Sequence, residues 1–151
     1  MGFSLIGTIL AMSIFAPNLL MIKFPPKNVP NNIKNEGIIH TLLERIGQVG
    51  CIGILVTSRD HFQNLKFNLW AVLIALSIAA YYCLWIRYVV KGQEYKLLWE
   101  PVWYIPIPMA VFPVCAFGFA AVWGNSIWLG IVAVCFAIGH FANSWQSYRD
   151  L

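Results

Sequence analysis

The sequence predicts an all-α polytopic membrane protein, a bundle of five transmembrane helices, and three observations favour this class. Hydrophobic residues make up 60% of the 151 residues and charged residues only 11%, with a mean hydropathy of +0.69. Soluble domains usually carry about 25% charged residues, so this chain has too little polar surface to face water on all sides. Apolar stretches recur at about the 20 residues needed to cross the hydrocarbon core of a bilayer, and the basic residues gather in alternate connecting segments.

Five apolar stretches are long enough to be transmembrane helices, and together they form a single domain over residues 1–151. They lie at about residues 3–22, 38–58, 69–90, 102–123 and 126–145. The second stretch contains Glu44 and Arg45, and a charge at the centre of a membrane helix costs about 2.5 to 3.5 kcal/mol on insertion scales. The alternative is therefore a four-helix protein in which the second stretch lies on the membrane surface.

Residues that flank the apolar stretches indicate where several of these helices begin or end. Residues 3–22 lack a basic amino-terminal region and are too long for the apolar part of a signal peptide, so we expect a first helix. Pro25 and Pro26 cannot continue that helix. Little more than Gly124 and Asn125 separates the fourth stretch from the fifth, so we expect these two helices to pack antiparallel as a hairpin.

The basic residues predict which side of the membrane each connection occupies. With five spans, seven of them fall on one side and two on the other. The larger set is Lys23, Lys27, Lys34, Arg87, Lys91, Lys96 and Arg149, and the smaller set is Arg59 and Lys66. Because positive charge is enriched in cytoplasmic loops, we expect the N-terminus outside and the C-terminus in the cytoplasm, with the cell membrane as the location.

A polar stripe interrupts the second apolar stretch. His40, Glu44 and Gln48 are four residues apart, so they share one face of a helix, whereas Arg45 is turned about 100° away from Glu44. In the predicted topology this stripe lies in the cytoplasmic half of the helix. The outer halves of all five helices are almost wholly apolar.

The other predicted helices carry their polar residues at the same cytoplasmic level. These residues are Asn18, Tyr81, Tyr82, Arg87, Tyr104, His140, Asn143 and Ser144. Polar groups inside a membrane must find partners, so we expect a polar cavity that opens toward the cytoplasm. Its expected ligand contacts are Glu44, His140, Gln48, His40 and Asn143, with Tyr81 and Tyr104 shaping its walls. In the alternative interpretation His40, Arg87 and Ser144 reach water or headgroups by snorkelling.

Glu44 has two interpretations that the sequence leaves open. In the structural one, Glu44 pairs with a cation on a neighbouring helix, such as Arg87 or His140, and stabilises the bundle. In the functional one, its carboxylate binds a ligand or exchanges a proton in a pocket of low dielectric constant.

A strip of glycines on the second helix predicts close packing. Gly47, Gly50 and Gly53 recur every three residues, and such small residues let another helix backbone approach. We expect the partner to be a helix of the same bundle. The alternative is a contact with a second copy of the chain or with another membrane protein.

Closely spaced prolines predict an irregular fourth helix. Pro101, Pro106, Pro108 and Pro113 remove backbone donors and leave carbonyls free. Broken helices at membrane depth often line binding sites. The alternative is a static kink, with Pro106 and Pro108 serving only the packing.

Several function classes lack their sequence signatures. Cys51, Cys83, Cys115 and Cys135 stand alone in apolar segments, without CxxC or Cys/His ligand spacing. No HExxH, Gly-rich phosphate loop or Ser/His/Asp order is present, and no basic run alternates with aromatics as expected for nucleic-acid binding. His40, Glu44 and His140 are residue types found in two-His-one-carboxylate metal sites, but a single His/Glu pair four residues apart does not predict one. No cofactor is assigned.

The segment LLWEPVWYIPIPMAVFPVCAFGFAAVW, and within it Trp99 to Trp123, resembles locally the Trp- and Pro-rich motif of the tryptophan-rich sensory protein (translocator protein) family. That family also has five helices at about this length. Here the motif lies in the fourth predicted helix instead of early in the chain, and the proline and tryptophan spacing differs. No ligand or residue role is therefore carried over.

The leading functional hypothesis is the binding, and by extension the translocation, of a small amphipathic molecule or lipid in the cytoplasm-facing cavity. The runner-up is a non-catalytic subunit or regulator that docks onto another membrane protein through the glycine strip and through Trp-rich faces. A membrane-embedded enzyme, with a histidine base oriented by a glutamate, is the third alternative.

Overall fold

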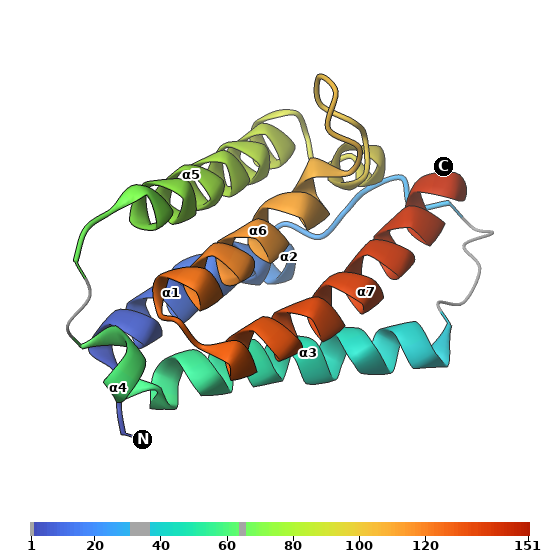
Figure 1. The fold of residues 1–151 in the computed structure, drawn as a ribbon. Helices are drawn as coiled ribbons and strands as arrows, with labels where there is room; N and C mark the ends of the chain where they lie inside the picture. Colours follow the sequence, from blue (N-terminus) through green and yellow to red (C-terminus); the bar gives the residue numbers. More distant parts are fainter. Residues whose placement is uncertain (1, 31–36, 64–65) are drawn as a thin grey trace.

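The structure is an all-helical bundle, as the composition predicts (Figure 1). It is a computed structural model that describes residues 2–30, 37–63 and 66–151, so Lys34 lies outside the described residues. In these ranges the elements are α1 (Leu5–Phe15), η1 (Ala16–Leu19), α2 (Leu20–Lys23), α3 (Ile38–Thr57), α4 (Arg59–Phe62), α5 (Leu69–Val90), η2 (Tyr95–Leu98), α6 (Pro108–Trp123) and α7 (Ile127–Arg149), where η denotes a 3₁₀ helix.

Within the described ranges, four helices are long and apolar enough to cross a membrane. Three of them are α3, α5 and α7, with 20, 22 and 23 residues. The fourth is the 19-residue unit Leu5–Lys23, in which α1, η1 and α2 follow one another without a break. Its 3₁₀ turn contains Pro17, which cannot donate a helical backbone hydrogen bond. These four helices agree closely with four of the five predicted stretches.

The fourth predicted stretch differs from the structure. A regular helix begins only at Pro108, not at residue 102, and α6 has 16 residues. At 1.5 Å per residue it is about 24 Å long, shorter than the roughly 30 Å of a hydrocarbon core. Prolines explain the late start because they interrupt backbone donation; Val102 and Ile105 instead pair across a tight turn. Ile107, held between Pro106 and Pro108, has a φ of 47°, a left-handed conformation that β-branched residues rarely adopt.

Side-chain caps determine where three of the helices begin. Ser4, Asn68 and Ser126 each accept hydrogen bonds from backbone N–H groups in the first turns of α1, α5 and α7. These N–H groups have no partner within their own helix. The caps account for the close agreement between the predicted and observed starts of these helices.

The long helices alternate in direction, so the bundle has two distinct ends. The N-terminus and α4 lie at one end, called here the α4 end, and the C-terminus lies at the opposite end (Figure 1). Contacts join α1 to α3, α3 to α7, α7 to α6 and α6 to α5, and the contact between α3 and α7 is the most extensive of these.

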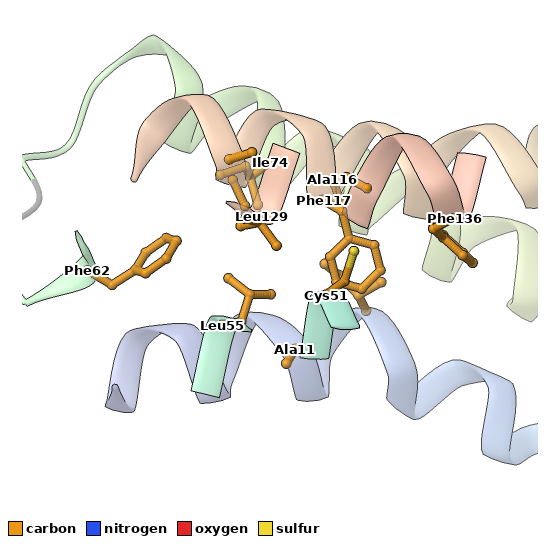
Figure 2. Close-up of a cluster of buried hydrophobic side chains, with 13 residues drawn as sticks. Ala11, Cys51, Leu55, Phe62, Ile74, Ala116, Phe117, Leu129 and Phe136 are labelled. Carbon is orange, nitrogen blue, oxygen red and sulfur yellow. The ribbon is translucent and has the colours of Figure 1, made fainter. Parts of the chain in front are cut away.

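Two hydrophobic clusters fill the interior. The first lies toward the α4 end (Figure 2) and consists of Ala11, Ile14, Cys51, Leu55, Phe62, Ile74, Ala116, Phe117, Ala120, Ala121, Leu129, Ala133 and Phe136. The second joins the later part of α5 to η2 and the start of α6, and consists of Tyr81, Leu84, Trp85, Tyr88, Tyr95, Leu97, Leu98 and Met109. The second cluster is rich in tyrosine and tryptophan, whose polar atoms need partners when they are buried.

Glycines allow α3 and α7 to approach until their backbones touch. A Cβ atom at Gly47 would overlap the backbone of Phe136, and one at Gly139 would overlap the backbone of Glu44 and of His40. Gly50 faces Val132 of α7, whereas nothing lies within 4 Å of a Cβ at Gly53. A three-residue step rotates about 60° around a helix, so Gly53 has turned away from α7. The glycine strip therefore packs internally at its first two positions.

Replacing Gly47 by alanine is expected to lower the stability of the bundle by about 1 to 3 kcal/mol, because the methyl group overlaps the Phe136 backbone and forces α3 and α7 apart. The matched control on the same helix is Gly53→Ala, which enters open space and gains up to about 1 kcal/mol of helix propensity. Thermal unfolding of the two variants in the same detergent compares them. Equal melting temperatures would contradict the close approach.

Candidate functional site

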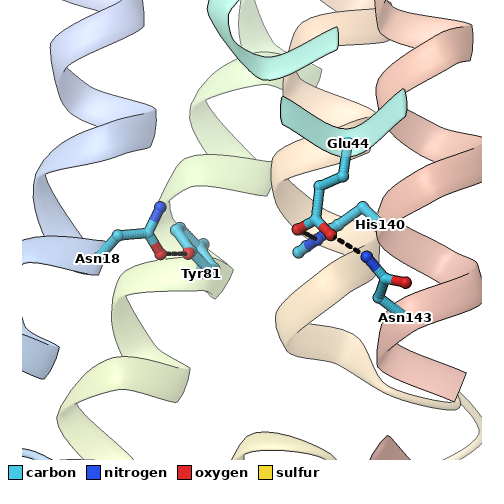
Figure 3. Close-up of polar contacts among 5 residues, drawn as sticks. All are labelled: Asn18, Glu44, Tyr81, His140 and Asn143. Carbon is cyan, nitrogen blue, oxygen red and sulfur yellow. Dashed lines mark hydrogen bonds and ion pairs between the residues drawn. The ribbon is translucent and has the colours of Figure 1, made fainter. Parts of the chain in front are cut away.

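Three polar side chains from α3 and α7 meet in the half of the bundle away from α4. The Nδ1 atom of His140 lies 2.7 Å from Oε1 of Glu44, and the Asn143 amide donates to Oε2 of the same carboxylate at 2.5 Å (Figure 3). Asn143 is buried, and the side chains of Glu44 and His140 are each 23% exposed. Glu44 therefore has a partner on each of its oxygens.

The ring of His140 is held in one orientation by two contacts. It stacks on Phe136 with 4.8 Å between ring centroids and 16° between planes. An ionised carboxylate only accepts hydrogen bonds, so the bond to Glu44 places the ring proton on Nδ1. In the neutral ring the other nitrogen, Nε2, is then an acceptor, and it has no hydrogen bond within the described part of the chain.

A second polar pair faces this cluster from α5 and η1. The hydroxyl of Tyr81 donates to Oδ1 of Asn18 at 2.6 Å (Figure 3). Tyr81 is 4% exposed, so this bond satisfies a hydroxyl that is shielded from solvent. The pair links α5 to the N-terminal helical unit at the level of His140.

A cavity of about 110 Å³, called here the central cavity, lies between the two polar clusters. Its polar lining residues are Asn18, Tyr81, Trp85, Trp99, His140 and Ser144. Its apolar lining includes Met21, which is 38% exposed and marks where the cavity reaches the surface. A smaller cavity of about 30 Å³ adjoins it, shares Asn18, Tyr81 and His140, and adds Gln48.

Two indole N–H groups of residues that line the central cavity have no hydrogen-bond partner in the described part of the chain. They belong to Trp85 and Trp99, and both nitrogens are shielded from solvent. Trp85 is 3% exposed; it lies close to the Tyr81 hydroxyl without forming a well-aligned hydrogen bond to it. A buried donor without an acceptor costs about 1 to 3 kcal/mol, so the cavity contains unused capacity to bind an acceptor group.

Not every predicted site residue belongs to this arrangement. Glu44, His140 and Asn143 come together, Tyr81 faces them, and Gln48 lines the smaller cavity. By contrast, His40 is exposed at the start of α3. Tyr104 is 99% exposed on the turn between Val102 and Ile105, so it does not form a cavity wall; the prolines that delay α6 place it outside the bundle.

The remaining charged and proline positions lie at the edge of the site. Arg87 pairs with Glu100 at 2.5 Å and not with Glu44, while Arg45 is exposed on α3. Pro106 is exposed, and Pro108 is buried as the first residue of α6. In the described ranges no three His, Cys, Asp or Glu side chains gather where they could share a metal ion.

Four polar residues of the central cavity were not predicted as ligand contacts: Asn18, Trp85, Trp99 and Ser144. Asn18 and Ser144 were predicted only to lie at the same level. Trp85 follows Tyr81 by four residues, so the helical period could have placed it on the same face. Ser144 follows His140 by the same spacing. Trp99 has no such signal, because its position depends on the path of the chain through η2.

Comparisons with known proteins add no relatives: no protein-family model, curated protein or solved structure matches the chain. The local resemblance of Trp99 to Trp123 to the translocator protein family is therefore not supported by a family match. Functional conclusions rest on the geometry of the site.

The substitution Glu44→Gln is expected to lower the free energy of unfolding by about 1 to 3 kcal/mol. The new amide accepts with one oxygen only and presents its NH₂ group to either His140 or Asn143, both of which donate to Glu44 in the wild type. The control is Glu100→Gln, which weakens the more exposed pair with Arg87 and should cost less than about 1 kcal/mol. Denaturation in mixed micelles measures both. If Glu44→Gln left the free energy of unfolding unchanged, the pairing would not stabilise the bundle.

Proposed function

We propose that this chain is an integral membrane protein that binds a small amphipathic molecule or lipid, with the polar group of the ligand in the central cavity. The observation that carries the proposal concerns Trp85 and Trp99, which line the cavity and whose shielded indole N–H groups have no acceptor among the described residues. Native proteins rarely leave such donors unpaired. Ligand oxygens that accept from these N–H groups would satisfy them.

The size and lining of the cavity support a small or slender ligand. An apolar cavity of about 150 Å³ accommodates benzene, and the central cavity, at about 110 Å³, is of the same order. Leu98, Met109 and Ala110 line its apolar side, and exposed Met21 leaves a route for a longer alkyl chain to reach the lipid. Translocation would require a second opening toward the α4 end, where the first core cluster is closely packed. Binding is therefore the primary function proposed.

The proposal includes five spans, with the N-terminus outside the cell membrane and the C-terminus in the cytoplasm. The alternating helix directions and the asymmetry of seven basic residues against two support this topology. α6 is short for a span, but irregular backbone is tolerated at membrane depth where it is covered by protein or lines a cavity, and Trp99 lines the cavity just before α6. The cavity then opens on the cytoplasmic side.

A second candidate function, that of a membrane-embedded enzyme, is favoured by one observation. The Glu44 carboxylate orients His140, a residue that lines the cavity, and leaves its Nε2 without a partner among the described residues, which is the arrangement of a general base. The two candidate functions differ in what happens to the bound molecule. A binding protein releases it unchanged, whereas an enzyme converts it. The subunit hypothesis has no support from the first two positions of the glycine strip, since Gly47 and Gly50 contact α7 and do not offer a free face.

The topology predicts that tags at the two ends of the chain are accessible from opposite sides. In intact cells, an impermeant reagent should label an N-terminal tag but should label a C-terminal tag only after the membrane is opened. Labelling of both ends from the same side would indicate an even number of spans. A reversed pattern would retain five spans and overturn the orientation.

The ligand is expected to co-purify with the wild-type protein and to be lost from the Trp85→Phe variant, which removes one N–H group and keeps an aromatic ring. The matched control is Trp145→Phe on α7, because Trp145 is 49% exposed and does not line the cavity. Mass spectrometry of solvent extracts compares the three proteins. The same compound at equal occupancy in all three would count against the central cavity as its site.

A further inference from the structure

The hydrogen-bonding groups around the central cavity are complementary to a particular kind of polar group. The indole N–H groups of Trp85 and Trp99 can only donate. In the neutral ring of His140, Nε2 accepts while Nδ1 donates to Glu44. A ligand that satisfies all three must donate one hydrogen bond and accept two.

The residue types that line the cavity favour a neutral ligand. Among the residues that the structure describes, no Lys, Arg, Asp or Glu lines either the central or the smaller cavity, so a charged ligand would enter without a directly contacting counter-ion from them. An anion would also face the carboxylate of Glu44 behind His140 and would have no proton to donate to Nε2. An ammonium group could donate to Nε2, but it would leave both indole N–H groups without an acceptor.

From this pattern we infer that the ligand of the proposed binding site is a neutral amphiphile whose polar group is an O–H group, an alcohol or a protonated carboxylic acid. The hydroxyl donates to Nε2 of His140, and the ligand oxygens accept from Trp85 and Trp99. Glu44 and Asn143 are positioning residues, because they act on the ligand only through the tautomer and orientation of His140. This inference rests on the proposed function and specifies the class of ligand.

A series of six-carbon ligands that differ only in the polar group tests the inference. Hexanol carries the O–H group, pentyl methyl ether has the same number of heavy atoms but no donor, and hexylamine and hexanoic acid are charged at neutral pH. The protein is reconstituted in lipid nanodiscs with ¹⁵N-labelled histidine. Its three histidines give three sets of ring signals, and a His140→Gln variant assigns those of His140.

Hexanol is expected to shift the Nε2 signal of His140 and to leave the signals of His40 and His61 in place. The ether should bind at least about tenfold more weakly, because a site built to bind a hydroxyl is left with an unpaired polar group. Hexylammonium and hexanoate should not shift the signal. Trp85→Phe should weaken hexanol binding by about tenfold, and Trp145→Phe should not. Repeating the acid titration near the pKa of hexanoic acid, with hexanol as the reference, distinguishes an alcohol from a protonated acid.

Equal binding of the alcohol and the ether would overturn the inference, as would stronger binding of either charged compound. If none of the four binds while a co-purified compound still depends on Trp85, the O–H assignment fails and the proposed function stands. If no compound co-purifies and none of the four distinguishes wild type from Trp85→Phe, both the inference and the proposed function fail.

Discussion

The close approach of α3 and α7 is the constraint on which the rest of the site depends. Gly47 and Gly139 remove the side chains that would separate the two backbones, and they do so on either side of the contact between Glu44 and His140. A glutamate side chain is short, and it reaches the ring nitrogen because its backbone lies against Gly139. Packing at two glycines thus sets the distance on which the histidine tautomer, and through it the hydrogen-bonding character of the cavity, depends.

The interior combines two kinds of packing with different consequences. Toward the α4 end, the packed side chains are those of alanine, isoleucine, leucine and phenylalanine, with the single thiol of Cys51. Farther along, aromatic residues with polar atoms surround a cavity, and only some of those atoms have partners in the described part of the chain: Tyr81 has Asn18, whereas the indole N–H of Trp85 has none. Buried polar atoms that lack a hydrogen-bond partner lower the stability of the folded protein. A bound polar group of the kind proposed above would remove this cost.

The helices of this fold are easier to predict from the sequence than the rotation of each helix relative to its neighbours. The run from Leu69 to Val90 is uniformly apolar and is preceded by Asn68, so the bounds of α5 could be predicted from local signals. Glu44 and His140 could be predicted to lie at one level because each falls at a similar depth in its apolar segment. That Glu44 pairs with His140 and not with Arg87 depends on the rotation of α7, which Gly139 permits. Local periodicity carries no information about that rotation.

The turn before α6 has a consequence for how the bundle would sit in a bilayer. Trp103 and Tyr104 are 92% and 99% exposed at its tip, and no partner within the described residues covers them. Their amphipathic rings favour the boundary between lipid headgroups and hydrocarbon. With α6 shorter than the hydrocarbon core, these two rings would fix the depth of immersion at that edge of the bundle. The lipid would then be thinned beside α6, and the mouth of the cavity at Met21 would lie close to the headgroups.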